Sequence, residues 1–161
     1  MGEPSRLPSS LADPMFRQID SPPRKPGMVA LEAHVEELCE AHGIEIAGAS
    51  RRGRATRWRG GRREIAIPEI RGQVSYFIAL HEIGHLVGPG RSAPRLEAEA
   101  NAWLWALRNS AVEPTPATRR SISKRLRGYL EWAQNRQYRR VPPRIPPREH
   151  LFWKLMESGA A

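Results

Sequence analysis

The sequence predicts an α+β fold that is mainly helical and contains a small antiparallel sheet. Two observations indicate this class. Apolar residues recur at helical spacing in several segments that glycines and prolines separate. Between the first two of these segments, short runs of alternating apolar and polar residues are typical of strands. With 161 residues, 40% of them apolar, the chain suits one domain with short appendages.

Composition divides the chain into three parts. Residues 1–27 contain six of the 15 prolines and show no periodicity, which predicts a flexible arm. Residues 28–137 carry the periodic segments and form the predicted domain. Residues 138–161 begin with a stretch rich in proline and arginine, typical of an extended strap, and end in a short helical pattern over 149–156.

The first helix is expected over Met28–His42, where apolar and acidic residues occupy opposite faces and Gly43 follows the last turn. Cys39 lies on the apolar face and is expected to be an inert core residue. It is the only cysteine, which excludes a disulfide framework and a thiolate zinc cluster.

Three strands are expected next, over Ile44–Ala49, Ala55–Arg59 and Arg63–Pro68. Gly60 and Gly61 suit a two-residue hairpin turn between the last two strands. The expected result is an antiparallel sheet packed on the following helix. The last strand could offer its edge to an extended substrate.

The same region is rich in arginine, with seven between residues 51 and 63 and Trp58 among them. We expect a solvated hairpin face with Trp58 in the core; the alternative is a surface that binds phosphates or stacks on a base. The net charge of +9, with 23 arginines among the 26 basic residues, suits an acidic partner or nucleic acid. A coding bias of a GC-rich genome would produce the same composition.

Residues 76–88 are strongly apolar and contain the pattern H-E-x-x-H at His81, Glu82 and His85. On an α-helix, residues four apart lie on the same face, so both imidazoles can bind one Zn²⁺. Glu82 projects towards the same open side, where it can take a proton from the attacking water. Three polar side chains without partners would be costly on an apolar helix, so the sequence predicts a zinc site.

A further helix is expected from about Ala93 or Pro94 to Asn109. Glu99 lies between Leu96 and Trp103 at helical spacing and therefore shares their buried side, whereas Glu97 is rotated by about 200° towards solvent. A buried carboxylate needs a cation, which zinc would supply. Glu99 is therefore the expected third ligand, and Glu97 is the alternative.

The last long helix is expected from Pro116 to about Gln137, with Thr115 as its N-cap. Hydrolysis of a peptide bond also needs a group that stabilises the oxyanion. Tyr129, Tyr138 and His150 are candidates for this role, and the sequence does not choose among them.

The two motif-bearing helices resemble those of the ImmA/IrrE family of small zincin-like metallopeptidases. Members show an H-E-L-G-H-type helix followed by a Glu-Ala-Asn-x-Phe-Ala-type helix. Here the second motif reads Glu99-Ala100-Asn101-Ala102-Trp103, so a tryptophan replaces the usual phenylalanine. The Leu-Met-Pro that commonly follows is matched only in part here, by Val112-Glu113-Pro114.

The resemblance covers roughly Leu31 to Pro114, and it implies that the predicted domain over 28–137 is zincin-like and a zinc-dependent endopeptidase. The implied substrate is a regulatory protein, such as a DNA-binding repressor of a phage or mobile element. The competing interpretation is a catalytically silent zincin scaffold, or a DNA-associated protein that binds nucleic acid or a regulator through its Arg-rich surface. A protease recruited to DNA-bound substrates, similar to the SprT-like zincins, is a related alternative.

Targeting signals are not evident in the sequence. No apolar run approaches the roughly 20 residues that cross a bilayer, and the first ten residues lack the apolar core of a signal peptide. We therefore expect a cytoplasmic protein without a membrane partner. The sequence does not predict its oligomeric state.

Overall fold

The computed structural model of the chain describes residues 26–90 and 92–159. The predicted arm over 1–27 lies outside this part except for its last two residues. The helices are α2 (Pro26–His42), α3 (Gln73–Val87), α4 (Arg95–Arg108), α5 (Pro116–Gln134) and α6 (Leu151–Glu157). The strands are β1 (Ile44–Ala49), β2 (Arg54–Arg57) and β3 (Arg63–Ile67). The predicted α+β class is confirmed.

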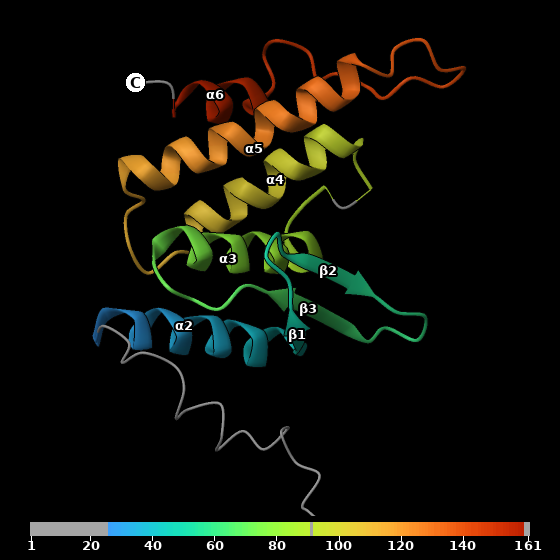
Figure 1. Cartoon of the computed structure of the whole chain (residues 1–161). Coiled ribbons are helices and arrows are strands. Elements are labelled where there is room, and N and C mark those ends of the chain that lie inside the picture. The colour runs from blue at the N-terminus through green and yellow to red at the C-terminus, as the bar shows by residue number, and fades with distance from the viewer. Residues whose placement is uncertain (1–25, 91, 160–161) are drawn as a thin grey trace, which may run out of the picture.

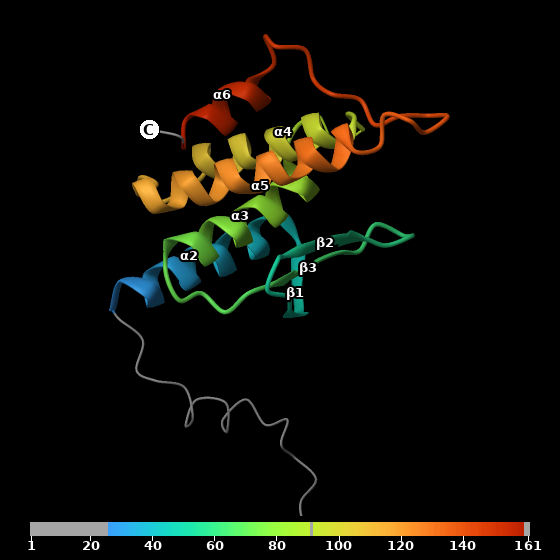
Figure 2. The ribbon, with the colours of Figure 1, turned by 45° about the horizontal axis from the view of Figure 1, so that its top comes forward.

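The elements are stacked around α3 (Figure 1). Helix α2 and the sheet lie on one side of α3, and α4, α5 and α6 lie on the other. Every residue from Tyr76 to Gly84 is buried. A helix that is enclosed on all sides can be apolar all round, which explains the composition of this segment. The segment that joins α5 to α6 forms turns and loops out before it returns to α6 (Figure 2).

One apolar cluster joins all the described helices to β1 and β3. The C-terminal α6 belongs to it, because Phe152 is completely buried in the same core. Cys39 is also buried, and burial raises the pKa of its thiol to about 11, with a smaller contribution from Glu36. A thiol that stays protonated at neutral pH has little nucleophilic reactivity, as expected for a core residue. No helix of the described part is long and apolar enough to cross a membrane.

The sheet is mixed, and the expectation of a wholly antiparallel sheet is wrong. The strand order is β1-β3-β2, with β2 antiparallel and β1 parallel to β3. Strand β3 thus inserts between two strands that precede it in the chain. Alternation of apolar and polar residues marks a strand but does not determine which neighbour it pairs with, so the sequence could not reveal this order.

The hairpin between β2 and β3 also differs from expectation. A hydrogen bond from the backbone N–H of Trp58 to the carbonyl oxygen of Arg62, 2.8 Å long, closes its loop. Arg59, Gly60 and Gly61 form the turn, and both glycines have φ of 90°. Trp58 is 49% exposed and is not a core residue, because it follows the last residue of β2 and belongs to the exposed hairpin loop.

Helices α3 and α4 approach closely at a glycine. A Cβ atom on Gly84 would lie 2.7 Å from the carbonyl oxygen of Ala102 in α4. A side chain at this position would push the two helices apart. Because α3 and α4 carry the motifs singled out in the sequence, their separation matters for the site.

We expect Gly84→Ala to destabilise the protein by about 1–3 kcal/mol, since the clash outweighs the gain of about 1 kcal/mol in helix propensity. Gly128 is the matched control: it lies within α5, and a Cβ there would meet nothing within 4 Å. Gly128→Ala should leave stability unchanged or raise it by up to about 1 kcal/mol. Urea unfolding followed by circular dichroism measures both, and equal shifts in the two variants would contradict the close helix approach.

Candidate metal centre

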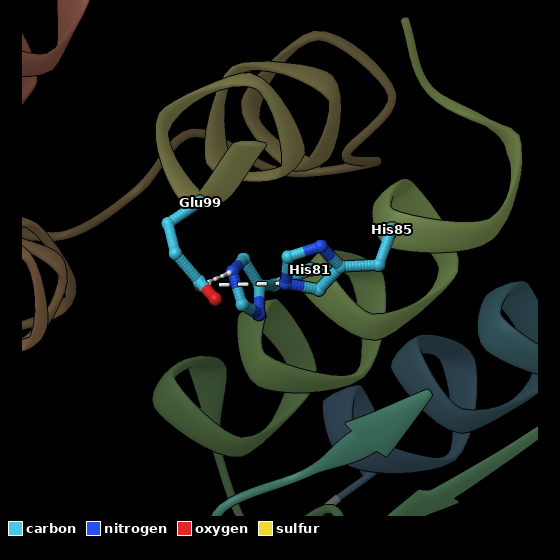
Figure 3. Close-up of side chains that lie close together, drawn as sticks. All are labelled: His81, His85 and Glu99. Atoms are coloured by element: carbon cyan, nitrogen blue, oxygen red, sulfur yellow. Dashed lines mark hydrogen bonds and ion pairs between the residues drawn. The ribbon is translucent and has the colours of Figure 1, made fainter. Parts of the chain in front are cut away.

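Three side chains converge between α3 and α4 (Figure 3). His81 and His85 project from consecutive turns of α3, and Glu99 projects towards them from α4. One oxygen of Glu99, Oε2, lies 3.0 Å from Nε2 of His81 and 3.3 Å from Nε2 of His85. The ligand atoms of the three residues all lie within 4.8 Å of one another, so this group could hold a metal ion.

The separations of these atoms fit one tetrahedral ion. Nitrogen and oxygen ligands bind Zn²⁺ at about 2.0–2.2 Å, and two ligands of a tetrahedron are then about 3.3 Å apart. The distances of 3.0 and 3.3 Å are close to this value. Two imidazoles and one carboxylate also form a common donor set for a catalytic zinc, which keeps a fourth position open. We find that the residues present fit such an ion.

The electrostatics of the group explain why a cation would be bound there. His81 and Glu99 are only 5% and 7% exposed. Burial would raise the pKa of Glu99, but its hydrogen bonds to the two histidines lower the pKa to about 2. Burial lowers the pKa of His81, yet the hydrogen bonds and charges of Glu82 and Glu99 raise it overall. An ionised carboxylate is therefore held beside the imidazoles, where positive charge stabilises it.

The ring of His81 is fixed by two further contacts. It stacks on the indole of Trp103, with ring centres 4.1 Å apart and an interplanar angle of 23°. Its other nitrogen, Nδ1, lies 3.1 Å from Oε1 of Glu82. A proton on Nδ1, donated to Glu82, would let Nε2, which here contacts Oε2 of Glu99, bind a metal instead.

Glu82 lines the same cavity as the histidines, next to a glycine turn. A Cβ on Gly53 would lie 2.5 Å from Oε1 of Glu82, and Gly53 has φ of 79°. Only glycine allows the backbone before β2 to pass this close to the carboxylate in that conformation. The turn and the histidine thus hold Glu82 at the edge of the site.

The cavity has a volume of about 780 Å³ and contains all four of the predicted site residues, His81, Glu82, His85 and Glu99. Ala55 and Arg57 of β2 also line it. Because β3 is the central strand, the expectation that its edge is open to a substrate is wrong. The edge strand beside the site is β2.

Glu97, the alternative third ligand, is directed elsewhere. Its Oε1 lies 3.4 Å from Nε of Arg144, in the segment between α5 and α6, and its side chain is 15% exposed. The expectation that Glu97 faces solvent is therefore wrong, because the C-terminal segment covers this part of α4. Glu97 is not part of the His–His–Glu group.

The three oxyanion candidates are placed differently. Tyr129 lines the cavity, and its pKa is raised to about 12 by burial and by the nearby Glu99 carboxylate. Tyr138 is exposed and does not line the cavity. His150 caps α6 by accepting a hydrogen bond from the backbone N–H of Phe152. Tyr129 is thus the candidate that the fold brings to the site.

Some residues of the site were not found from the sequence. Trp103 was expected to be buried, and its position four residues after Glu99 could have indicated a contact with the ligands. Gly53 gave no signal, because its role depends on the approach of β2 to α3. Arg95 and Arg125 line the cavity from α4 and α5, but they could not be distinguished from the many exposed arginines.

No family model matches the sequence, and neither a curated protein nor a solved structure matches the chain significantly. The function therefore has to be inferred from the site itself.

We expect wild-type protein to bind one equivalent of zinc and Glu99→Ala to bind it more than roughly 100-fold more weakly, since even the outer partners of metal ligands contribute 10–100-fold. Glu97→Ala is the control, because it removes a neighbouring carboxylate but leaves the three ligand atoms in place. Elemental analysis and competition with a chelator measure both. Full zinc binding by Glu99→Ala, or its loss in Glu97→Ala, would contradict this assignment.

Proposed function

We propose that the protein is a zinc-dependent endopeptidase that acts in the cytoplasm on a regulatory protein. The observation that carries the proposal is the convergence of His81, His85 and Glu99 on one point beside Glu82, in a cavity that opens next to an edge strand. Such an edge can pair with an extended peptide through main-chain hydrogen bonds. This pairing would present a peptide carbonyl to the site.

In the proposed reaction, a Zn²⁺ ion held by His81, His85 and Glu99 would act as a Lewis acid and lower the pKa of the attacking water. Glu82 takes the proton of this water as the oxygen attacks the carbonyl carbon, and then gives it to the leaving amine. Trp103 and Glu82 keep the His81 ring in position through the stacking contact and the bond at Nδ1. Gly53 keeps the backbone of the β2 turn against Glu82.

Tyr129 is the group we propose for stabilising the oxyanion. It lines the cavity from α5 and lies near Glu99. Because its pKa is raised, the hydroxyl stays protonated at neutral pH and can donate a hydrogen bond to the developing negative charge.

The likeness of the two helices to the ImmA/IrrE family suggests the substrate class. This likeness implies that the protein cleaved is a repressor of a phage or mobile element. We propose a DNA-binding regulatory protein of this kind as the partner, supplied as a separate chain.

A DNA-associated role is the second candidate, and one observation favours it. Trp58 is exposed on the hairpin, with the guanidinium of Arg62 5.5 Å from its ring centre. Exposed aromatic rings among arginines can stack on bases and contact phosphates. Salt-dependent binding of single-stranded DNA, lost in Trp58→Ala, would support this role. Equal DNA binding by wild type and Trp58→Ala would contradict this role for Trp58.

We expect Glu82→Gln to retain zinc but to lose about 10²–10⁴-fold in cleavage rate, because an amide can still accept the bond from His81 but cannot take a proton. Hydrolysis of fluorescently labelled casein and of a peptide mixture measures the rate, and elemental analysis measures the zinc. Wild-type proteolysis by Glu82→Gln would exclude the mechanism.

Tyr129→Phe should lower kcat by roughly 10²–10³-fold with little change in KM or zinc content, since it removes a donor that acts mainly in the transition state. Tyr138→Phe is the control, because this exposed hydroxyl lies away from the cavity. If both variants keep full activity, another group stabilises the oxyanion.

A further inference from the structure

Basic side chains line the cavity that contains the His–His–Glu group. Arg52, Arg57, Arg95 and Arg125 all contribute to its walls. A neighbouring cavity of about 630 Å³ shares Arg52, Arg95 and Arg125 with it and adds Lys124. The two cavities therefore form parts of one cationic groove, defined by these five residues, which extends from the site along α5.

Among the residues that the structure describes, no carboxylate forms an ion pair with a basic side chain of this groove. Within residues 26–90 and 92–159, other arginines such as Arg62 and Arg144 form ion pairs with glutamates. None of the ion pairs between described residues involves a member of the cationic groove. The carboxylates that line the main cavity are Glu82 and Glu99, which the proposed reaction employs.

Neutral groups hold Arg95 and Arg57 of the groove in place instead. The guanidinium of Arg95 lies 4.9 Å from the ring centre of Trp132 and 5.5 Å from that of Tyr129. Nη2 of Arg57 donates a hydrogen bond of 2.8 Å to the carbonyl oxygen of Leu86. Stacking occupies the face of a guanidinium and leaves N–H groups at its edge, which suit a carboxylate. The groove thus presents positioned cations to a ligand.

We propose that the cationic groove selects peptide segments that carry Asp or Glu beside the residue held at the His–His–Glu group. Several like charges in one cleft attract an oppositely charged ligand and favour it over a neutral one. As a statement about cleavage, the proposal rests on the proposed peptidase function. As a statement about binding, it stands on the groove alone.

A peptide suits this groove better than a nucleic acid for two reasons. The carboxylate of Glu82 lies within the same cavity and would repel a phosphate placed beside it, whereas a bound metal ion would offset the charge of Glu99. A peptide can place its separate acidic side chains on the arginines and a neutral residue at the carboxylates. The edge strand β2, which also lines the cavity, can pair with a peptide backbone.

The test measures binding, with full-length zinc-loaded Glu82→Gln protein so that the probe stays intact. Fluorescence anisotropy compares a labelled peptide that has Asp and Glu on both sides of a central Ala-Leu with the same peptide carrying Asn and Gln. We expect about tenfold tighter binding of the acidic peptide, as a few charge-assisted contacts in a partly exposed cleft would give. Adding Arg95→Gln and Arg125→Gln should abolish this preference.

Arg120→Gln with Arg127→Gln is the matched control. Both residues are exposed on α5 and line neither cavity, yet the net charge changes by the same amount. This pair should keep most of the preference. Equal binding of the two peptides, or equal losses in the two double variants, would overturn the proposal. Tighter binding of a 12-nucleotide single-stranded DNA, lost only in the groove variant, would also overturn it in favour of nucleic acid.

The same measurements test the peptidase function independently of the cationic groove. A preference for the acidic peptide in a protein that cleaves no substrate would support the groove and contradict the peptidase. Cleavage of casein by wild type at sites without neighbouring Asp or Glu would support the peptidase and overturn the groove.

Discussion

A buried carboxylate oxygen that faces two imidazole nitrogens is the constraint on which the rest of the structure depends. Burial of an ionised group is costly unless a positive charge lies beside it, and Glu99 has the imidazoles of His81 and His85 beside it, where an ion could also bind. The residues around the group serve to keep it together. Gly84 lets α4 approach α3 closely, and Trp103 stacks on His81.

The placement of these polar groups explains the architecture of the domain. Helix α3 is enclosed by α2 and the sheet on one side and by α4 and α5 on the other, so its histidines reach the site from a helix packed within the core. The group lines a cavity. The edge strand β2, the turn at Gly53 and helix α5 form walls of this cavity, and the side chain of His85, which also lines it, is 23% exposed. A buried ligand set that borders a cavity suits a metal that keeps one coordination position open.

Local sequence spacing predicted the helices and the ligand residues, whereas the packing of distant segments could not be predicted from it. The repeat of four between His81 and His85 defines a shared helix face, and the spacing of Glu99 from Leu96 and Trp103 defines a buried one. Helical periodicity also located all five described helices to within a few residues. The order of the strands, the exposure of Trp58 and the pairing of Glu97 with Arg144 depend on contacts between distant segments. Local sequence patterns carry little information about such contacts. Which of the many arginines border the site was hidden for the same reason.

The most direct measurement is anomalous diffraction at the zinc absorption edge, from crystals of protein purified in the presence of zinc. We expect a single strong peak between α3 and α4, about 2.0–2.2 Å from Nε2 of His81, Nε2 of His85 and the carboxylate of Glu99. A zinc peak elsewhere with the three side chains turned apart, or a position between them that stays empty under saturating zinc, would contradict the central claim.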